Sequence, residues 1–305
     1  MLQQRSILYR FVLGGIRRSS STAGQGALIT SATHAKTSSD HPKTTTTVKL
    51  SSSSRQKKPL FVQCGANAAT SVPARVIKLD KQFIIVNKPN NILSQPDSTG
   101  DESLDESVER FLKEYYNKPG NAFVAVVHRL DRPVSGLTVL ATTSKAASRL
   151  AEQIRQRQFK KDYLAVVPVK NLEGRRDGEI LGETEDETLV WKHVYTARNS
   201  YAVLHVRITS GKKHQIRRQL AHKGIGPVIG DLRFNSTFQS PREFPPSKGV
   251  MLHASKLSFI HPTRPEEIVE ATCAPPWPEE FIPPFFEFER ERQMSKRDEE
   301  RRERK

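Results

Sequence analysis

The sequence lacks the features that mark secreted and membrane proteins. Its 305 residues include only two cysteines, Cys64 and Cys273, which form no C-x-x-C pair. Neither a disulfide framework nor a cysteine zinc site is indicated, and a reducing compartment fits this composition. The longest apolar stretches, such as residues 122–127 and 164–169, are about a third of the roughly 20 residues that a helical membrane span needs. We therefore expect neither a helical span nor a membrane partner.

Several catalytic signatures are also missing. No G-x-S-x-G, G-x-x-x-x-G-K-[ST] or G-x-G-x-x-G motif occurs, which excludes the nucleophile elbow, the phosphate loop and the dinucleotide fingerprint. Ser135, His128 and Asp131 are close in sequence, but without the elbow they do not indicate a serine hydrolase. His214 and His222 are eight residues apart, about 12 Å along a helix, too far to bind one metal ion.

The first 39 residues contain no acidic side chain. Five basic residues lie there, and the first carboxylate of the chain is Asp40. This composition is typical of a cleavable organelle presequence. We therefore predict a presequence over residues 1–39 and a mitochondrial location, with a plastid or cytoplasmic location as alternatives. A disordered tail is the competing interpretation.

The regions that flank the predicted domain have low-complexity compositions. About half of residues 19–54 are Ser or Thr, with almost no large apolar side chains to offset the entropy of ordering. We interpret residues 40–60 as a disordered linker. Residues 287–305 carry eight basic and seven acidic side chains, which indicates a solvated helix or a frayed tail. The remaining stretch, 61–286, has the size of one catalytic domain.

The charge of the chain favours a polyanionic partner. Lys and Arg total 49 against 33 Asp and Glu, giving a formal net charge of +16. Residues 1–60 carry ten basic and one acidic side chain, so the predicted domain still keeps a net charge of +6 once both ends are set aside. Such a field attracts polyanions. Nucleic acid is therefore the leading partner class.

Strand-like runs outnumber helix-like runs in the predicted domain. The expected strands are residues 75–79, 83–87, 124–128, 137–141, 163–169, 190–196, 202–209 and 257–261. The expected helices are residues 103–116, 144–159 and 212–222. Because strands and helices do not alternate one for one, the pattern predicts an α+β fold with a mixed, mainly antiparallel central sheet and a few flanking helices.

The segment HRLDRPVSGL lies between two apolar strand-like runs. Pro133 fixes one backbone angle and Gly136 permits a turn, so Asp131 can be presented rigidly. Arg129 and Arg132 flank this carboxylate, and cations at that distance keep a carboxylate ionised and can contact phosphates. The alternative is an ordinary Asp–Arg bridge in a surface turn.

The next segment, SKAASRLAEQIRQRQFKK, predicts an amphipathic helix with Ser144 as its N-cap. Its basic side chains are expected to face solvent or phosphates, although such a run is usually only a solvated helix face. They are Lys145, Arg149, Arg155, Arg157, Lys160 and Lys161. Tyr163 follows at a strand start, where a phenol can stack on a base or move a proton. Its alternative role is that of a core tyrosine.

A third segment, TSGKKHQIRRQLAH, ends a strand and begins a short helix. Ile216 and Leu220 are one turn apart and anchor the helix, which places Arg217 at the edge of the buried stripe. A guanidinium there can be half-buried against a carboxylate, so Arg217 is a candidate partner for Asp131. Three further side chains at the start of the expected helix are candidate RNA contacts: Lys212, Lys213 and His214.

These segments, in this order, resemble the RluA family of pseudouridine synthases. HRLDRPVSGL resembles the family's catalytic motif, which is HRLD, two variable positions and Ser-Gly. VIKLDKQFIIVNKP resembles its opening strand pair, and KKDYLAVV its tyrosine motif. SGKKHQIRRQLAHKGIGPVIGDLRF and LHASKLSFIHPTRPE resemble its later segments. The likeness spans about residues 75–278.

The resemblance implies isomerisation of uridine to pseudouridine in RNA, such as rRNA or tRNA. Asp131 matches the essential carboxylate, and Tyr163 the tyrosine that stacks on the base and helps take the proton of carbon 5. Arg217 matches the arginine that pairs with the carboxylate. Arg129 matches the one that fills the duplex when uridine flips out. No metal ion or cofactor is implied, because the reaction is redox-neutral and consumes no water.

Family members often carry an N-terminal S4 RNA-binding domain, which the Ser/Thr-rich stretch before residue 60 does not resemble. We therefore expect substrate choice to rest on the catalytic domain, through Arg132, and on its basic helix, through Lys145 and Arg149. We also expect a monomer. The rival hypothesis is a catalytically inactive RNA-binding or ribosome-assembly factor with the same fold.

Overall fold

The computed structural model describes residues 59–65, 71–182, 187–234, 240–284 and 286. The predicted presequence, nearly all of the linker and the charged tail lie outside these residues. Cys64 and Cys273 are both free. Within the described part, no helix is long and apolar enough to cross a membrane.

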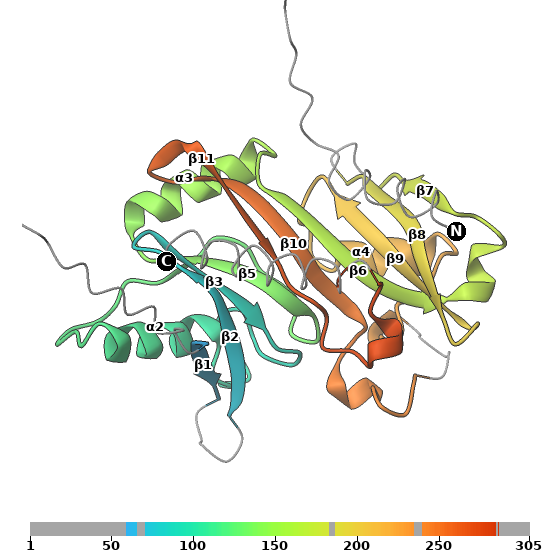
Figure 1. Cartoon of the computed structure of the whole chain (residues 1–305), viewed down its shortest axis with the longest axis horizontal. Helices are drawn as coiled ribbons and strands as arrows, with labels where there is room; N and C mark the ends of the chain where they lie inside the picture. The colour runs from blue at the N-terminus through green and yellow to red at the C-terminus, as the bar shows by residue number, and fades with distance from the viewer. Residues whose placement is uncertain (1–58, 66–70, 183–186, 235–239, 285, 287–305) are drawn as a thin grey trace, which may run out of the picture. The chain divides into compact units, whose positions relative to one another are not determined.

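The described strands form one eleven-stranded sheet (Figure 1). The strands are β1 (Phe61–Cys64), β2 (Val72–Leu79), β3 (Phe83–Lys88), β4 (Ala125–Val126), β5 (Ser135–Ala141), β6 (Lys160–Pro168), β7 (Asp177–Ile180), β8 (Leu189–Ala197), β9 (Tyr201–Ile208), β10 (Leu252–His261) and β11 (Arg264–Thr272). Their order is β1-β2-β3-β5-β10-β6-β9-β8-β7, with β11 on β10 and β4 on β5. Only β5 and β10 pair in parallel among these strands. The predicted α+β fold with a mixed, mainly antiparallel sheet is confirmed.

Three α-helices accompany the sheet in the described part. They are α2 (Leu104–Tyr115), α3 (Ser144–Arg155) and α4 (Gln215–His222), with 3-10 turns η1 (Val169–Leu172), η2 (Leu232–Phe234), η3 (Pro246–Lys248) and η4 (Glu279–Phe281). The predicted N-cap Ser144 is wrong by one residue, because Thr143 caps α3 through its Oγ1, which accepts the N–H of Ala146 at 3.2 Å. The prediction also made α3 too long. Lys160 and Lys161 belong to β6.

Three strands were not predicted: β1, β7 and β11. β11, with the sequence RPEEIVEAT, pairs only with β10 and exposes most of its charged residues, so its alternation is weak. β7 falls in an acidic stretch to which the sequence assigns no structure. The expected strand at residues 124–128 is reduced to the two residues of β4.

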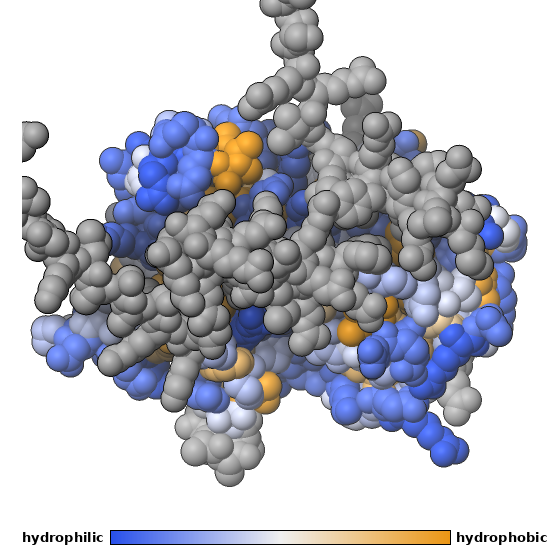
Figure 2. All heavy atoms as spheres, in the orientation of Figure 1, coloured by the Kyte–Doolittle hydropathy of each residue, from blue (hydrophilic) through white to orange (hydrophobic). Residues whose placement is uncertain are grey.

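Two helices cover opposite faces of the same half of the sheet. Side chains alternate along β3, so Ile84 packs with Val108 of α2, whereas Ile85 packs in the cluster that contains Leu150 of α3. Each helix presents an apolar stripe to the sheet. Polar side chains are left for the surface, and the coloured part of the face in Figure 2 is mostly hydrophilic with small separate apolar patches.

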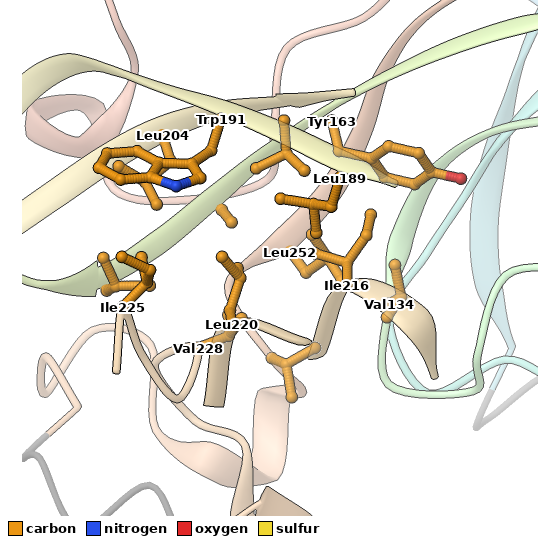
Figure 3. Close-up of a cluster of buried hydrophobic side chains, with 14 of the residues drawn as sticks. Val134, Tyr163, Leu189, Trp191, Leu204, Ile216, Leu220, Ile225, Val228 and Leu252 are labelled. Carbon is orange, nitrogen blue, oxygen red and sulfur yellow. The ribbon is translucent and has the colours of Figure 1, made fainter. Parts of the chain in front are cut away.

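The other half of the sheet packs against α4. Tyr163 and Ala165 of β6 lie in the same cluster as Ile216 and Leu220 of α4, which Figure 3 shows in part. The alternate residue Leu164 lies in a cluster on the opposite face. This alternation fixes the side of the sheet on which Tyr163 lies. Figure 3 shows its ring at one end of the cluster, with the phenol oxygen pointing away from it.

A glycine allows the two parallel strands to meet. Gly136 has a φ of +124°, and a Cβ on it would lie 2.4 Å from the backbone nitrogen of Ala254. No other residue fits this contact without moving the strands. The close pairing of Gly136 with Ala254 and of Ser135 with His253 places the start of β5 directly beside β10. The loop that carries Asp131 leads into this junction.

Candidate active site

Asp131 accepts hydrogen bonds from two side chains of the α4 region. Nη1 of Arg217 donates to Oδ2 of Asp131 at 2.9 Å, and Nδ1 of His214 lies 2.8 Å from the same oxygen. The predicted pairing of Arg217 with Asp131 is confirmed. His214, which the sequence suggested as an RNA contact, lies instead against the carboxylate, at the first residue before α4.

Arg217 is also held by a second carboxylate, which the sequence analysis missed. Its Nε donates to Oδ2 of Asp231 at 2.7 Å and its Nη2 to Oδ1 at 2.8 Å. Asp231 is fully buried. The guanidinium also lies over the ring of Phe234, with its central carbon 5.4 Å from the ring centroid. Because this bidentate pair fixes the plane of the guanidinium, Nη1 is aimed at Asp131.

The pair of Asp131 and Arg217 is ionised at neutral pH. Burial alone would raise the pKa of Asp131, but the hydrogen bonds and charges of His214 and Arg217 outweigh it and hold that pKa below its ordinary value. Burial would lower the pKa of Arg217, but its bonds to Asp231 and Asp131 raise it. The site therefore presents a carboxylate, not a carboxylic acid.

The segment after β3 fixes the backbone on either side of Asp131. The hydroxyl of Ser94 donates to the carbonyl of Leu130 at 2.8 Å and accepts the N–H of the same residue at 3.1 Å. Nδ2 of Asn90 donates to the carbonyl of Pro133 at 2.7 Å. Side-chain bonds thus replace the missing secondary structure of this loop.

Lys88 also anchors the loop of Asp131, through hydrogen bonds to backbone carbonyls. It is fully buried, and its ammonium donates to the carbonyls of Pro89 at 3.0 Å, Ile92 at 2.7 Å and Arg132 at 3.2 Å. Burial lowers the pKa of Lys88 to about 7. The one side chain therefore ties the segment after β3 to the loop of Asp131.

The histidine of the HRLD segment has a structural role. Nε2 of His128 accepts the N–H of Val139 at 3.0 Å, and its ring packs on Phe159. Burial, with a smaller contribution from the charge of Lys161, lowers its pKa to about 3, so the ring is neutral. Ser135 bonds to His253 at 2.9 Å. These contacts give no support to a serine nucleophile activated by His128.

Asp131 lies where two hollows meet. We call the first the inner chamber; its lining includes Val134, Lys161, Tyr163, Gln215, Ile216 and Leu252. We call the second the outer cleft; it has a volume of about 570 Å³, and its lining includes Gln95, Pro96, Arg132, Lys213 and Arg233. Asp131, His214 and Arg217 line both. The cleft has the size of a small-molecule site.

Tyr163 lies on the inner chamber and is almost completely buried. Burial, followed by the charges of Asp131 and Asp162, raises the pKa of its phenol above the ordinary value. The phenol is therefore neutral at physiological pH. The structure thus brings Tyr163, Asp131 and Arg217 together, as the sequence predicted.

The predicted RNA contacts separate into two groups. Arg129 and Lys212 line both hollows, and Lys213 lines the outer cleft. Arg132 also lines the cleft and pairs with Asp101 at 2.5 Å. These cations surround the mouth of the site.

Lys145 and Arg149 form the second group, on α3. Neither lines the inner chamber or the outer cleft, and Nη1 of Arg149 donates to the carbonyl of Pro262 at 2.5 Å. The structure therefore does not bring them together with Asp131. Among the described residues, no three His, Cys, Asp or Glu side chains are grouped so that they could hold a metal ion.

The comparison with known proteins agrees with this geometry. The family model of RNA pseudouridylate synthase matches residues 82–222, which include Asp131, Tyr163 and Arg217. Over this stretch the chain is similar to RNA pseudouridine synthases. The matched stretch includes the HRLD segment, which Lys88 and Ser94 hold beside Arg217.

Curated relatives span different lengths of this chain. An uncharacterized RNA pseudouridine synthase of Mycoplasma pneumoniae is 31% identical and aligns with 64% of this chain and 65% of its own length. The tRNA pseudouridine synthase C of Vibrio parahaemolyticus is 28% identical, and the alignment covers 72% of this chain and 98% of the relative. The ribosomal large subunit pseudouridine synthase D of Xylella fastidiosa is 29% identical, with 63% of each covered. The chain thus spans slightly less than two thirds of two of these relatives.

Two solved structures share the fold. The human RNA pseudouridylate synthase domain containing 4 superposes with a TM-score of 0.53 at 18% identity, covering 68% of this chain and 89% of the human chain. The human RNA pseudouridylate synthase domain containing 1 superposes with a TM-score of 0.52 at 21% identity, covering 68% of this chain and 86% of the human chain.

Replacement of Asp231 should destabilise the protein strongly. Asp231→Asn leaves the buried Arg217 with one carboxylate instead of two, and loss of one partner of a buried ion pair costs about 3 kcal/mol or more. The matched control is Asp101→Asn, which removes the exposed pair with Arg132 and should cost less than about 1 kcal/mol. Urea unfolding of both variants measures the difference. Equal losses would show that Asp231 contributes no more than a surface ion pair.

Proposed function

We propose that this chain is an RNA pseudouridine synthase that isomerises uridine to pseudouridine in structured RNA. The observation that carries the proposal is the ionised carboxylate of Asp131, which a buried guanidinium holds at the junction of the inner chamber and a cationic cleft. An extruded base could reach the inner chamber through the outer cleft, and the cations of the cleft suit the phosphates beside that base.

Asp131 is positioned for chemistry at the ribose. In the isomerisation the bond between the sugar's anomeric carbon and ring nitrogen 1 breaks, the uracil turns, and carbon 5 takes the vacated place. A carboxylate can add to the anomeric carbon or stabilise its positive charge, as in glycosidases, or can remove a sugar proton. Each route needs an ionised carboxylate, which Arg217 and His214 maintain.

Tyr163 supports the base in this proposal. Its ring lies on the inner chamber beside the apolar side chains of Val134 and Leu252, so it offers a flat surface for an extruded uracil. Because burial raises the pKa of the phenol, packing against the base is favoured over removal of a proton by a phenolate.

The substrate we propose is tRNA or rRNA. Curated relatives are named for tRNA and for the ribosomal large subunit. The cations at the mouth of the site would contact phosphates around the extruded nucleotide. We also propose a mitochondrial location, which the acid-free, basic composition of residues 1–39 supports.

Asp131→Asn should abolish pseudouridine formation, by about 1,000-fold or more, because the amide can neither add to the sugar nor take its proton. RNA affinity should change by less than a few fold, since Asp131 faces the sugar and not the phosphates. Tritium release from RNA labelled at carbon 5 of uridine measures turnover. Asp97→Asn, at the rim of the cleft, is the control and should stay active. Turnover by purified Asp131→Asn would refute the proposal.

RNA binding should depend steeply on salt through the cations of the cleft. Each phosphate contact adds about 0.7 to 0.9 to the slope of log affinity against log salt. The double variant Lys212→Gln/Lys213→Gln should therefore lower the slope by about 1.5. Filter binding between low and physiological salt measures it. In the control Lys145→Gln/Arg149→Gln the slope should be unchanged, and the reverse pattern would place the RNA over α3.

A fluorescent reporter tests the proposed mitochondrial location. Residues 1–40 fused to a fluorescent protein should direct it to mitochondria, because their basic side chains are not balanced by acids over the first 39 residues. A fusion in which Arg10, Arg17 and Arg18 are replaced by Glu should stay in the cytosol. Diffuse fluorescence of the unmodified fusion would contradict the proposed location.

A further inference from the structure

One cation lies in the inner chamber without a partner. Lys161 lines this chamber but not the outer cleft, and it makes no hydrogen bond or ion pair with any residue of the described part. Its ammonium lies against Gly211: a Cβ on that glycine would be 3.4 Å from Nζ of Lys161. The sequence left Lys161 for solvent or for phosphates, whereas the structure places it in β6 on the wall of the chamber.

The pleat of β6 turns Lys161 toward the chamber. Successive strand residues point to opposite faces, so Lys161 and Tyr163 share one face and Lys160 takes the other. The pairing of β6 with β9 is regular from Asp162 onward, with Tyr163 opposite Val206. Lys160 is exposed, whereas Lys161 is half-buried. The two neighbouring lysines therefore have different surroundings.

A second donor lines the same chamber. Oε1 of Gln215 accepts hydrogen bonds from the hydroxyl of Ser210 at 2.9 Å and from the N–H of Lys212 at 3.2 Å. Its Nε2 is therefore left as a buried donor with no partner among the described residues. Buried donors of this kind are rare unless a ligand or water meets them. A ligand that presents acceptor oxygens, as uracil does through its two carbonyls, suits this chamber.

We propose that Lys161 is a catalytic residue that donates a hydrogen bond to a carbonyl oxygen of the extruded uracil and stabilises the negative charge of the ring as the glycosidic bond breaks. The inference rests on the proposed function and names a group that its chemistry needs. A preorganised cation in a partly dry chamber is effective where such charge develops.

The electron count of the step shows why a cation is needed. When the bond between the anomeric carbon and nitrogen 1 breaks, its electron pair leaves with the ring, and the charge spreads onto both carbonyl oxygens. Asp131 either supplies a pair to the anomeric carbon or removes a sugar proton. The ring pair then forms the new bond from carbon 5, while the bond to Asp131 breaks or, in the second route, the sugar regains its proton. The proton of carbon 5 departs to solvent, and nitrogen 1 gains a proton.

A phosphate contact is the competing role for Lys161, and its position argues against it. Arg129 and Lys212 line both hollows and can reach the backbone of an RNA in the outer cleft, whereas Lys161 lines only the inner chamber. Burial lowers the pKa of Lys161 to about 8, which still leaves it mainly protonated at neutral pH. Asp131 is already paired with Arg217 and His214, so the ammonium of Lys161 remains available to a ligand.

The test compares Lys161→Met with Lys160→Met in the full chain. Both lose one positive charge from β6, but only the first loses it from the chamber. For Lys161→Met we expect the single-turnover rate on uridine RNA to fall by about 100-fold or more, with RNA affinity within about threefold. Lys160→Met should keep the rate of the unmodified protein. Lys161→Arg keeps the charge, should fold even if the Met variant does not, and should recover at least a tenth of the rate.

A substrate with a better leaving group separates catalysis from structure. Fluorine on carbon 5 stabilises the ring anion, so loss of 5-fluorouridine from RNA should be slowed less by Lys161→Met than the uridine reaction is, by about tenfold. Mass spectrometry of nuclease digests measures it. Equal slowing of both substrates, a rate within threefold of normal, or a loss confined to RNA affinity would each overturn the inference. Inactivity of the unmodified protein, or activity of Asp131→Asn, would instead sink the proposed function.

Discussion

The site depends on one buried guanidinium shared between two carboxylates. Arg217 is nearly inaccessible to solvent, and such a charge is tolerated only with full hydrogen bonding. Asp231 takes two of its nitrogens and sets its plane, so the third meets Asp131. The same contact that makes the arginine stable in the interior keeps Asp131 ionised. An ionised carboxylate is therefore obtained without exposing it fully to water, which would weaken its electrostatic interactions.

The fold supplies the precision that this contact needs. The loop that carries Asp131 lacks the regular backbone hydrogen bonds of a helix or a strand. Instead, the carbonyls on either side of Asp131 accept hydrogen bonds from Ser94, Asn90 and Lys88, which lie at or after the end of β3. The loop then enters β5, which Gly136 allows to lie tightly against β10. Since effective positioning requires the reacting group to be held within a fraction of an ångström, these contacts belong to the chemistry as much as to the stability.

The parts of the site that were predictable are those set by local pattern. A charged segment between two apolar strands indicated Asp131, and helical spacing placed Arg217 at the edge of a buried stripe. The roles of Asp231 and Ser94 could not be predicted from the local sequence pattern, because their hydrogen-bond partners are distant in sequence. The end of α3 was predicted four residues too late because the helix ends without Gly or Pro: Arg157 takes the left-handed turn, with φ of +58°.

The distribution of charge between the two hollows follows from the first contact. Asp131 is already paired with Arg217 and His214. Because the carboxylate is already satisfied, Lys161 remains unpaired on the chamber wall while the cations of the cleft remain for a polyanion. Under the proposed function, this arrangement of charges divides the site into a cleft for phosphates, a carboxylate at the boundary for the sugar, and a chamber of donors for the base.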